Sequence, residues 1–113
     1  MASGGRHSFS WNVAGDPLRL EVRIALLAVM CLETALPLGG DIDVQMQDGH
    51  WTIATSHDRL NLDPALWVPL SNGACPDDLG AAQVHFGLLP AMTAEAGRTL
   101  TLTHGADWVK VAF

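Results

Sequence analysis

The chain has 113 residues, which is enough for one domain with a single hydrophobic core and too few for two. Hydrophobic residues make up 49% of the sequence and charged residues 16%, a balance that indicates a globular domain and excludes an intrinsically disordered chain. The net charge is −6, and the six Lys and Arg residues are scattered along the sequence. We therefore expect this chain to bind neither nucleic acid nor an anionic membrane surface.

The sequence predicts no membrane span, no export signal and no disulfide framework. Its longest apolar run, at 24–32, is shorter than the roughly 20 residues that a bilayer-spanning helix needs. Cys31 lies inside that run and Cys75 in a loop-like stretch, which favours a reducing compartment. Residues 1–11 lack the apolar stretch of a secretory signal, so we expect a cytoplasmic protein.

We expect a disordered tail at 1–7 and one folded domain at 8–113, which begins with a strand and a long helix. Apolar and polar residues alternate at 8–13, the pattern of a half-buried strand. A helix is expected at 17–36, because Asp16 can cap it and the residue after Asp16 is a proline, which suits a first helical position. The middle of this helix is apolar all round, so more than one of its sides should be buried.

A hairpin should follow the long helix. Strand-like segments at 41–46 and 51–56 flank the dipeptide Asp48-Gly49, which accepts the positive φ angles of a tight turn. A short helix is then expected within 61–70.

The short helix should begin at Asp63 and Pro64 and end at Pro69, and further elements are expected after it. A second long helix is predicted at 79–97, with a kink at Pro90.

A second hairpin at 99–103 and 107–113 completes the chain. The whole order predicts a two-layer α/β (α+β) sandwich, in which helices cover one face of a mixed, mainly antiparallel sheet.

This order of elements resembles the catalytic and ATP-binding domain of histidine kinases, the Bergerat fold. Two segments sharpen the resemblance: "LLAVMCLETALPLGGDIDV" before the first hairpin, and the ending "LLPAMTAEAGRTLTLTHGADWVKVAF". Both are similar to the C-terminal half of ChpT-type histidine phosphotransferases, in which an ATPase-like domain has lost its nucleotide. The resemblance implies a phosphorelay component that docks response-regulator receiver domains, while a dimeric helical hairpin, absent from this chain, carries the phospho-accepting histidine.

The residues themselves also argue against ATP chemistry, so no cofactor is expected. A Bergerat site needs an asparagine on the first long helix to hold the metal, and here that position falls near Cys31 or Glu33. No aspartate-x-glycine-x-glycine follows the first hairpin, where the chain reads "HDRLNL". The segment in place of the lid is short and carries Asp77 and Asp78, which would repel phosphates.

Histidines could suggest other chemistry. "SHDRLNLDP" at 56–64 superficially resembles a phospho-acceptor box, but such a histidine belongs on a rigid helix, and His57 falls between a strand and a turn, so we interpret it as a surface-loop residue. His50, His85 and His104 show no local metal-ligand spacing with Cys75 or Asp107, so no metal is expected.

Several large or reactive side chains are most simply core residues. Cys31 has apolar neighbours, and we expect a small buried residue in place of a reactive thiol. The tryptophans at 11, 51 and 108 lie on expected strands and should be buried. Trp67 leaves two alternatives: core packing, or an exposed patch with Val68 and Leu70 that binds a partner.

The sequence thus predicts a receiver-docking domain of a histidine phosphotransferase, without catalysis of its own. We expect it to be monomeric alone and dimeric only through the missing helical hairpin. Two alternatives stay open: an unrelated binding module that shares the sandwich, and a divergent ATPase that takes its ligands from Glu33 or Asp58.

Overall fold

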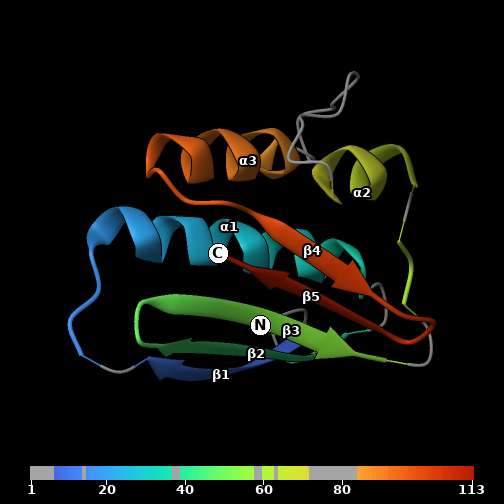
Figure 1. Cartoon of the computed structure of the whole chain (residues 1–113). Helices are drawn as coiled ribbons and strands as arrows, with labels where there is room; N and C mark the ends of the chain where they lie inside the picture. The colour runs from blue at the N-terminus through green and yellow to red at the C-terminus, as the bar shows by residue number, and fades with distance from the viewer. Residues whose placement is uncertain (1–6, 14, 37–38, 58–59, 63, 72–83) are drawn as a thin grey trace.

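The elements appear in the expected order along the chain (Figure 1). The computed structural model describes residues 7–13, 15–36, 39–57, 60–62, 64–71 and 84–113. Its helices and strands are β1 (His7–Val13), α1 (Arg19–Thr34), β2 (Gly40–Gln47), β3 (His50–Ser56), α2 (Pro64–Ser71), α3 (His85–Glu95), β4 (Thr101–His104) and β5 (Trp108–Ala112). His7 is the first residue of β1, and residues 1–6 lie outside the described part, so the expected disordered tail at 1–7 stays a prediction.

The strands form one mixed sheet in the order β1-β2-β3-β5-β4. Only the β1–β2 pair is parallel, and the other three pairs are antiparallel. A parallel pair needs a crossover between its strands, and α1 supplies it. The described helices lie together on one side of the sheet, which confirms the predicted two-layer arrangement (Figure 1).

The β2–β3 hairpin has the turn that the sequence predicts. Asp48 and Gly49 adopt positive φ angles of 53° and 80°, and the pairing of Gln47 with His50 leaves only these two residues in the loop.

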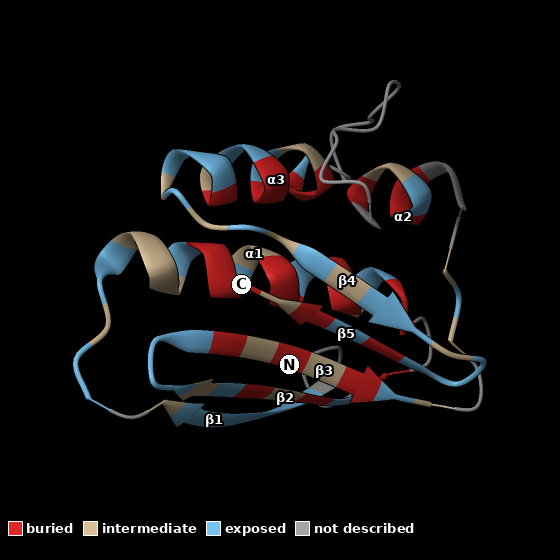
Figure 2. Ribbon diagram, viewed as in Figure 1, coloured by how far each residue is buried: buried red, intermediate tan, exposed pale blue. Residues whose placement is uncertain are grey.

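The core lies between the sheet and α1, and α3 covers a second side of α1. Six residues of α1 are buried: Ile24, Ala25, Ala28, Val29, Cys31 and Leu32. Buried residues are found on α1, β2, β3 and β5, the elements on the two sides of the interface between helix and sheet (Figure 2). The expectation that α1 is buried on more than one side is therefore confirmed.

The ends of α1 differ from the prediction. The helix starts at Arg19 after an extended Leu18, and no side chain caps it, so the expected cap at Asp16 is wrong. It stops at Thr34, with Ala35 as its C-terminal cap, two residues before the expected end. Gly39, at φ 89°, then lies on the path into β2.

Prolines end neither of the shorter helices. Pro69 lies inside α2, which runs on to Ser71, so the predicted end at Pro69 is wrong. Pro90 lies inside α3 and is buried. The described part of α3 starts at His85, whereas 79–83, where the helix was expected to begin, and the cap at Asp63 lie outside the described residues.

Only one of the three strand tryptophans is in the core. Trp51 is fully buried, but the exposed fractions of Trp11 and Trp108 are 47% and 40%, so the prediction of burial was wrong for these two. Trp11 lies on the edge strand β1 and contacts Trp51 with the ring edge, at 5.9 Å between centroids. Trp108 alternates with the buried Val109 and covers Gly105, where a Cβ would lie 2.1 Å from the indole Nε1.

A polar network fastens α1 to the sheet at Trp51. The indole Nε1 of Trp51 donates a hydrogen bond to Glu21 of α1 at 2.9 Å, and the same carboxylate pairs with Arg98 at 3.1 Å. Arg98 also donates to the carbonyl oxygens of Gly49 and Phe113, at 2.8 and 3.1 Å. Four parts of the chain that are distant in sequence therefore meet at one guanidinium group.

We predict that Arg98→Met lowers the free energy of unfolding by about 1–3 kcal/mol, because it leaves the largely buried Glu21 carboxylate without its cation and removes the hydrogen bonds to the carbonyl oxygens of Gly49 and Phe113. Urea denaturation followed by tryptophan fluorescence measures this loss. Lys110→Met is the matched control, since Lys110 is exposed and should change stability by no more than about 0.5 kcal/mol. Equal losses in the two variants would contradict the network.

Candidate functional site

The described residues between α1 and β2, which are 31–36, 39 and 40 and are here called the α1–β2 corner, are held together largely by apolar packing. Cys31 and Ala35 are fully buried, and Leu36 is 1% exposed. The side chain of Leu36 lies so close to Gly40 that a Cβ there would be 3.1 Å from it. The backbone N–H of Asn61 donates to the carbonyl oxygen of Ala35 at 2.9 Å, which ties the following loop to the helix end. The buried side chains of the corner, those of Cys31, Ala35 and Leu36, therefore carry no oxygen atom.

Cys31 is a core residue, as the sequence predicts. It is a free cysteine, and burial raises the pKa of its thiol far above the ordinary value. A thiol that stays protonated neither attacks an electrophile nor binds a metal. The residue near the expected metal-ligand position of a Bergerat site is therefore chemically inert.

Of the other proposed ligands, only Glu33 belongs to the described part of the chain, where it is partly exposed on α1. Asp58 and Cys75 lie outside the described residues, as do Asp77 and Asp78, which were expected to repel phosphates. The described part of the chain contains no group of three or more His, Cys, Asp or Glu residues that could hold a metal ion.

The histidines considered as metal ligands are dispersed over separate elements. His50 starts β3, His85 starts α3 and His104 ends β4. His50 and His104 are exposed, whereas His85 is 7% exposed.

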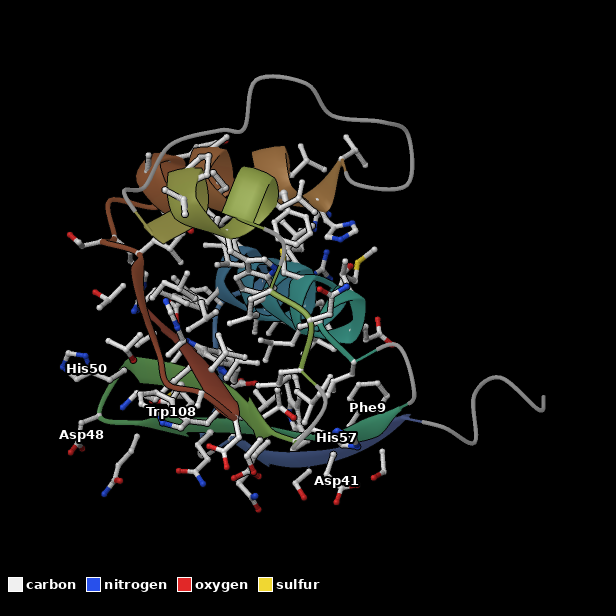
Figure 3. The ribbon with its side chains drawn as sticks, turned by 90° about the vertical axis from the view of Figure 1, so that its right-hand side faces the viewer. Phe9, Asp41, Asp48, His50, His57 and Trp108 are labelled. Atoms are coloured by element: carbon white, nitrogen blue, oxygen red, sulfur yellow. The ribbon has the colours of Figure 1, made fainter. Side chains whose placement is uncertain are left out.

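His57 lies in a loop at the end of β3 and not on a helix. Its backbone N–H donates to the carbonyl oxygen of Asp107 at 2.8 Å. Its ring lies over the start of β2, where a Cβ on Gly40 would be 3.6 Å from the ring atom Cδ2. Figure 3 shows His57 on the Asp41 side of the sheet, away from the hairpin with Asp48 and His50. This position fits the loop interpretation and lacks the rigid helix that a phospho-accepting histidine needs.

The exposed patch that was one of the two alternatives for Trp67, Val68 and Leu70 does not form as a unit. Trp67 and Leu70 are 4% and 1% exposed, and only Val68, at 56%, faces solvent. The Trp67 ring packs edge-on against Phe86 of α3 at 5.2 Å between centroids. Core packing is therefore the correct alternative for Trp67, because the short helix turns its large apolar residues toward α3. A partner-binding role of Val68 stays a prediction.

The sequence analysis did not predict a polar contact between the start of α3 and the end of α1. His85 is buried and its Nε2 lies 3.3 Å from the hydroxyl oxygen of Thr34, at the last residue of α1. Burial lowers the pKa of His85 below its ordinary value. The two residues are 51 positions apart, so no local pattern in the sequence could have paired them.

The sequence of the chain matches a known protein family. A family model described as "Histidine phosphotransferase C-terminal domain" matches residues 1–107. The chain belongs to this family. No curated protein matches it.

Two solved structures share the fold. A bacterial phosphotransferase is 20% identical, with a TM-score of 0.78, and the match covers 97% of this chain and 56% of the other. A blue-light activated histidine kinase of Erythrobacter litoralis is 16% identical, with a TM-score of 0.52, and the match covers 96% of this chain and 35% of the other.

These findings confirm the resemblance and the fold class that the sequence predicts. Family membership supports a role in a phosphorelay. The chain spans about half the length of the bacterial phosphotransferase that it matches. None of the helices in the described ranges has both the length and the hydropathy needed to span a membrane.

We predict that Cys31 of the folded chain does not react with a maleimide, because it is fully buried and its thiol stays protonated. The test uses a Cys75→Ser background, so that only one thiol remains, and follows the mass of the chain with time. Labelling should become complete only after urea unfolding. Rapid labelling of the native chain would show that the α1–β2 corner opens.

We also predict that His85 makes stability depend on pH. Because its pKa is lower in the folded chain than in the unfolded chain, the unfolded chain binds more protons below the ordinary pKa of about 6.5. The free energy of unfolding should therefore fall as the pH drops from about 7 toward 5. His85→Gln, measured by urea denaturation at each pH, should lose that part of the dependence, whereas His104→Gln, an exposed control, should keep it. Parallel curves for wild type and His85→Gln would contradict the assignment.

Proposed function

We propose that this chain is the docking domain of a histidine phosphotransferase, that it does not bind ATP, and that the phospho-accepting histidine lies outside its sequence. The closed α1–β2 corner carries this proposal. An ATP site needs oxygen ligands that hold Mg²⁺ and a hydrated space for the phosphates. Here Cys31 and Leu36 stand at the inner side of the corner, fully buried or nearly so, and Cys31 cannot supply an oxygen ligand.

The partner in this proposal is the receiver domain of a response regulator. Family membership supports it, because a histidine phosphotransferase passes phosphate between proteins and needs a surface that recognises them. Catalysis would require the helical hairpin with its histidine, so the chain alone would neither hydrolyse ATP nor accept phosphate. Dimer formation through that hairpin, a monomeric state of the chain alone and a cytoplasmic location belong to the same proposal.

We predict that calorimetric titration of the chain with Mg²⁺–ATP gives no detectable heat, because the buried Cys31, near the expected position of the metal ligand, has no side-chain oxygen to offer. An ATP-binding domain of a histidine kinase serves as the positive control. Binding in the micromolar range would overturn the proposal and favour a divergent ATPase that uses Glu33 or Asp58. Titration with a panel of receiver domains should instead give binding to at least one of them, and failure with every receiver would favour an unrelated binding module.

A further inference from the structure

A shallow apolar groove runs between α1 and α3. It has a volume of about 210 Å³ and is lined by Arg23, Leu26, Leu27, Met30 and Met92. Leu26 and Met30 are 49% and 45% exposed, so each keeps about half of its surface in water. We call this surface the α1–α3 groove.

The two helices run antiparallel along the groove. The end of α1 at Thr34 meets the start of α3 at His85, whereas Met92, two turns further along α3, lines the groove with Leu26 and Leu27. Leu88 lies one turn before Met92 on the same side of α3 and is 44% exposed. The apolar strip is therefore longer than the groove itself, and it fits a helix laid along it, with contacts at i, i+3 or i+4, and i+7.

Packing of the core does not explain why the exposed groove residues are apolar. The sheet and α3 already bury the other sides of α1. Leu26 and Met30 sit on a side where polar residues would be more soluble and equally compatible with a helix. Methionine side chains at positions 30 and 92 are flexible and polarizable, which lets such a surface adapt to a partner.

Two arginines continue the same stripe of α1, one at the edge of the groove and one beyond it. Arg19 and Arg23 are exposed and one turn apart, in a chain whose net charge is −6. Two like charges at i and i+4 repel each other, and cations are unfavourable at the start of a helix because of its dipole. Neither arginine makes an ion pair within the described residues. This local arrangement costs the helix stability and is complementary to an acidic group on a partner.

We infer that the α1–α3 groove is the docking surface for the receiver domain, and this inference rests on the proposed function. One surface helix of the receiver lies along the groove. Its apolar residues cover Leu26, Met30 and Met92, and an acidic side chain beyond them pairs with Arg23 and Arg19. The apolar contacts supply the affinity, and the charges set the direction of the helix and the rate of association.

The test measures binding of the receiver that binds wild type most tightly. The double variant Leu26→Gln/Met30→Gln should bind at least about tenfold more weakly, because it removes the apolar centre of the interface. Arg23→Glu should weaken binding about three- to tenfold and make it less sensitive to salt. An acidic-to-lysine substitution in the receiver helix that contacts the groove should restore binding to Arg23→Glu.

Two matched controls separate the groove from general surface effects. Phe9→Gln removes a similarly exposed apolar residue from β1, and Lys110→Glu reverses an exposed charge on β5. Both should bind within about twofold of wild type, since a surface substitution outside an interface has little effect on it. Circular dichroism and melting temperature check that each variant is folded. If the double variant does not fold, chemical-shift mapping on the wild-type chain replaces it, and shifts should centre on Leu26, Met30 and Met92.

The outcomes distinguish the two levels of the proposal. If wild type binds no receiver, the proposed function fails and the docking surface fails with it. If wild type binds and the groove variants bind equally well, or if the shifts centre on Val68 or on the outer face of the sheet, only the assignment of the groove is overturned. If sedimentation shows a dimer of this chain that the double variant abolishes, a second copy occupies the groove, which also overturns the receiver as its occupant.

Discussion

The burial of α1 on two sides is the constraint on which the rest of the structure depends. The parallel β1–β2 pair requires a crossover, and α1 is that crossover, so it must lie on the sheet. Trp51, Glu21 and Arg98 then fix its first turns to β3 and to the chain's end at Phe113. Since α3 covers a second side, only one stripe of α1 remains in water, and the apolar and cationic residues of the groove lie on that stripe.

The same packing explains the closed corner. Close contact of a helix with both a sheet and a second helix favours small apolar side chains at the contact, and α1 has Ala25, Ala28 and Cys31 there. A metal-binding asparagine in place of Cys31 would have to keep its amide hydrated or hydrogen-bonded, because a buried polar group without a partner is costly. This cost supports the proposal that the position serves the core and not an ATP site.

The sequence predicts the architecture better than the surface. Alternation and turn residues identify the strands and the Asp48-Gly49 hairpin, because both signals are local. The errors concern non-local effects. Alternation shows that Trp11 shares a face with Phe9, but it does not show that β1 lies at the edge of the sheet. It also does not show that Trp108 lies on the open face of the sheet. Pro69 was expected to end α2, but the helix tolerates it. The groove was missed because an apolar-all-round helix does not reveal which stripe the other helices leave uncovered.

Loss of the nucleotide would change what the remaining surface can do. An ATP-binding domain needs a hydrated cleft beside its first helix and a segment that moves over the phosphates, so that helix forms part of a changing site. Here the corresponding side of α1 is filled with buried side chains. A helix held by packing on two sides presents its third side in a fixed geometry. Fewer side chains and backbone segments then have to become ordered when a partner binds, so the entropic cost of binding is smaller. The filled corner and the exposed apolar groove are therefore consequences of one arrangement, because the packing that fills the corner also holds the α1–α3 groove in a fixed geometry. This common origin supports both the proposed loss of ATP binding and the proposed docking surface.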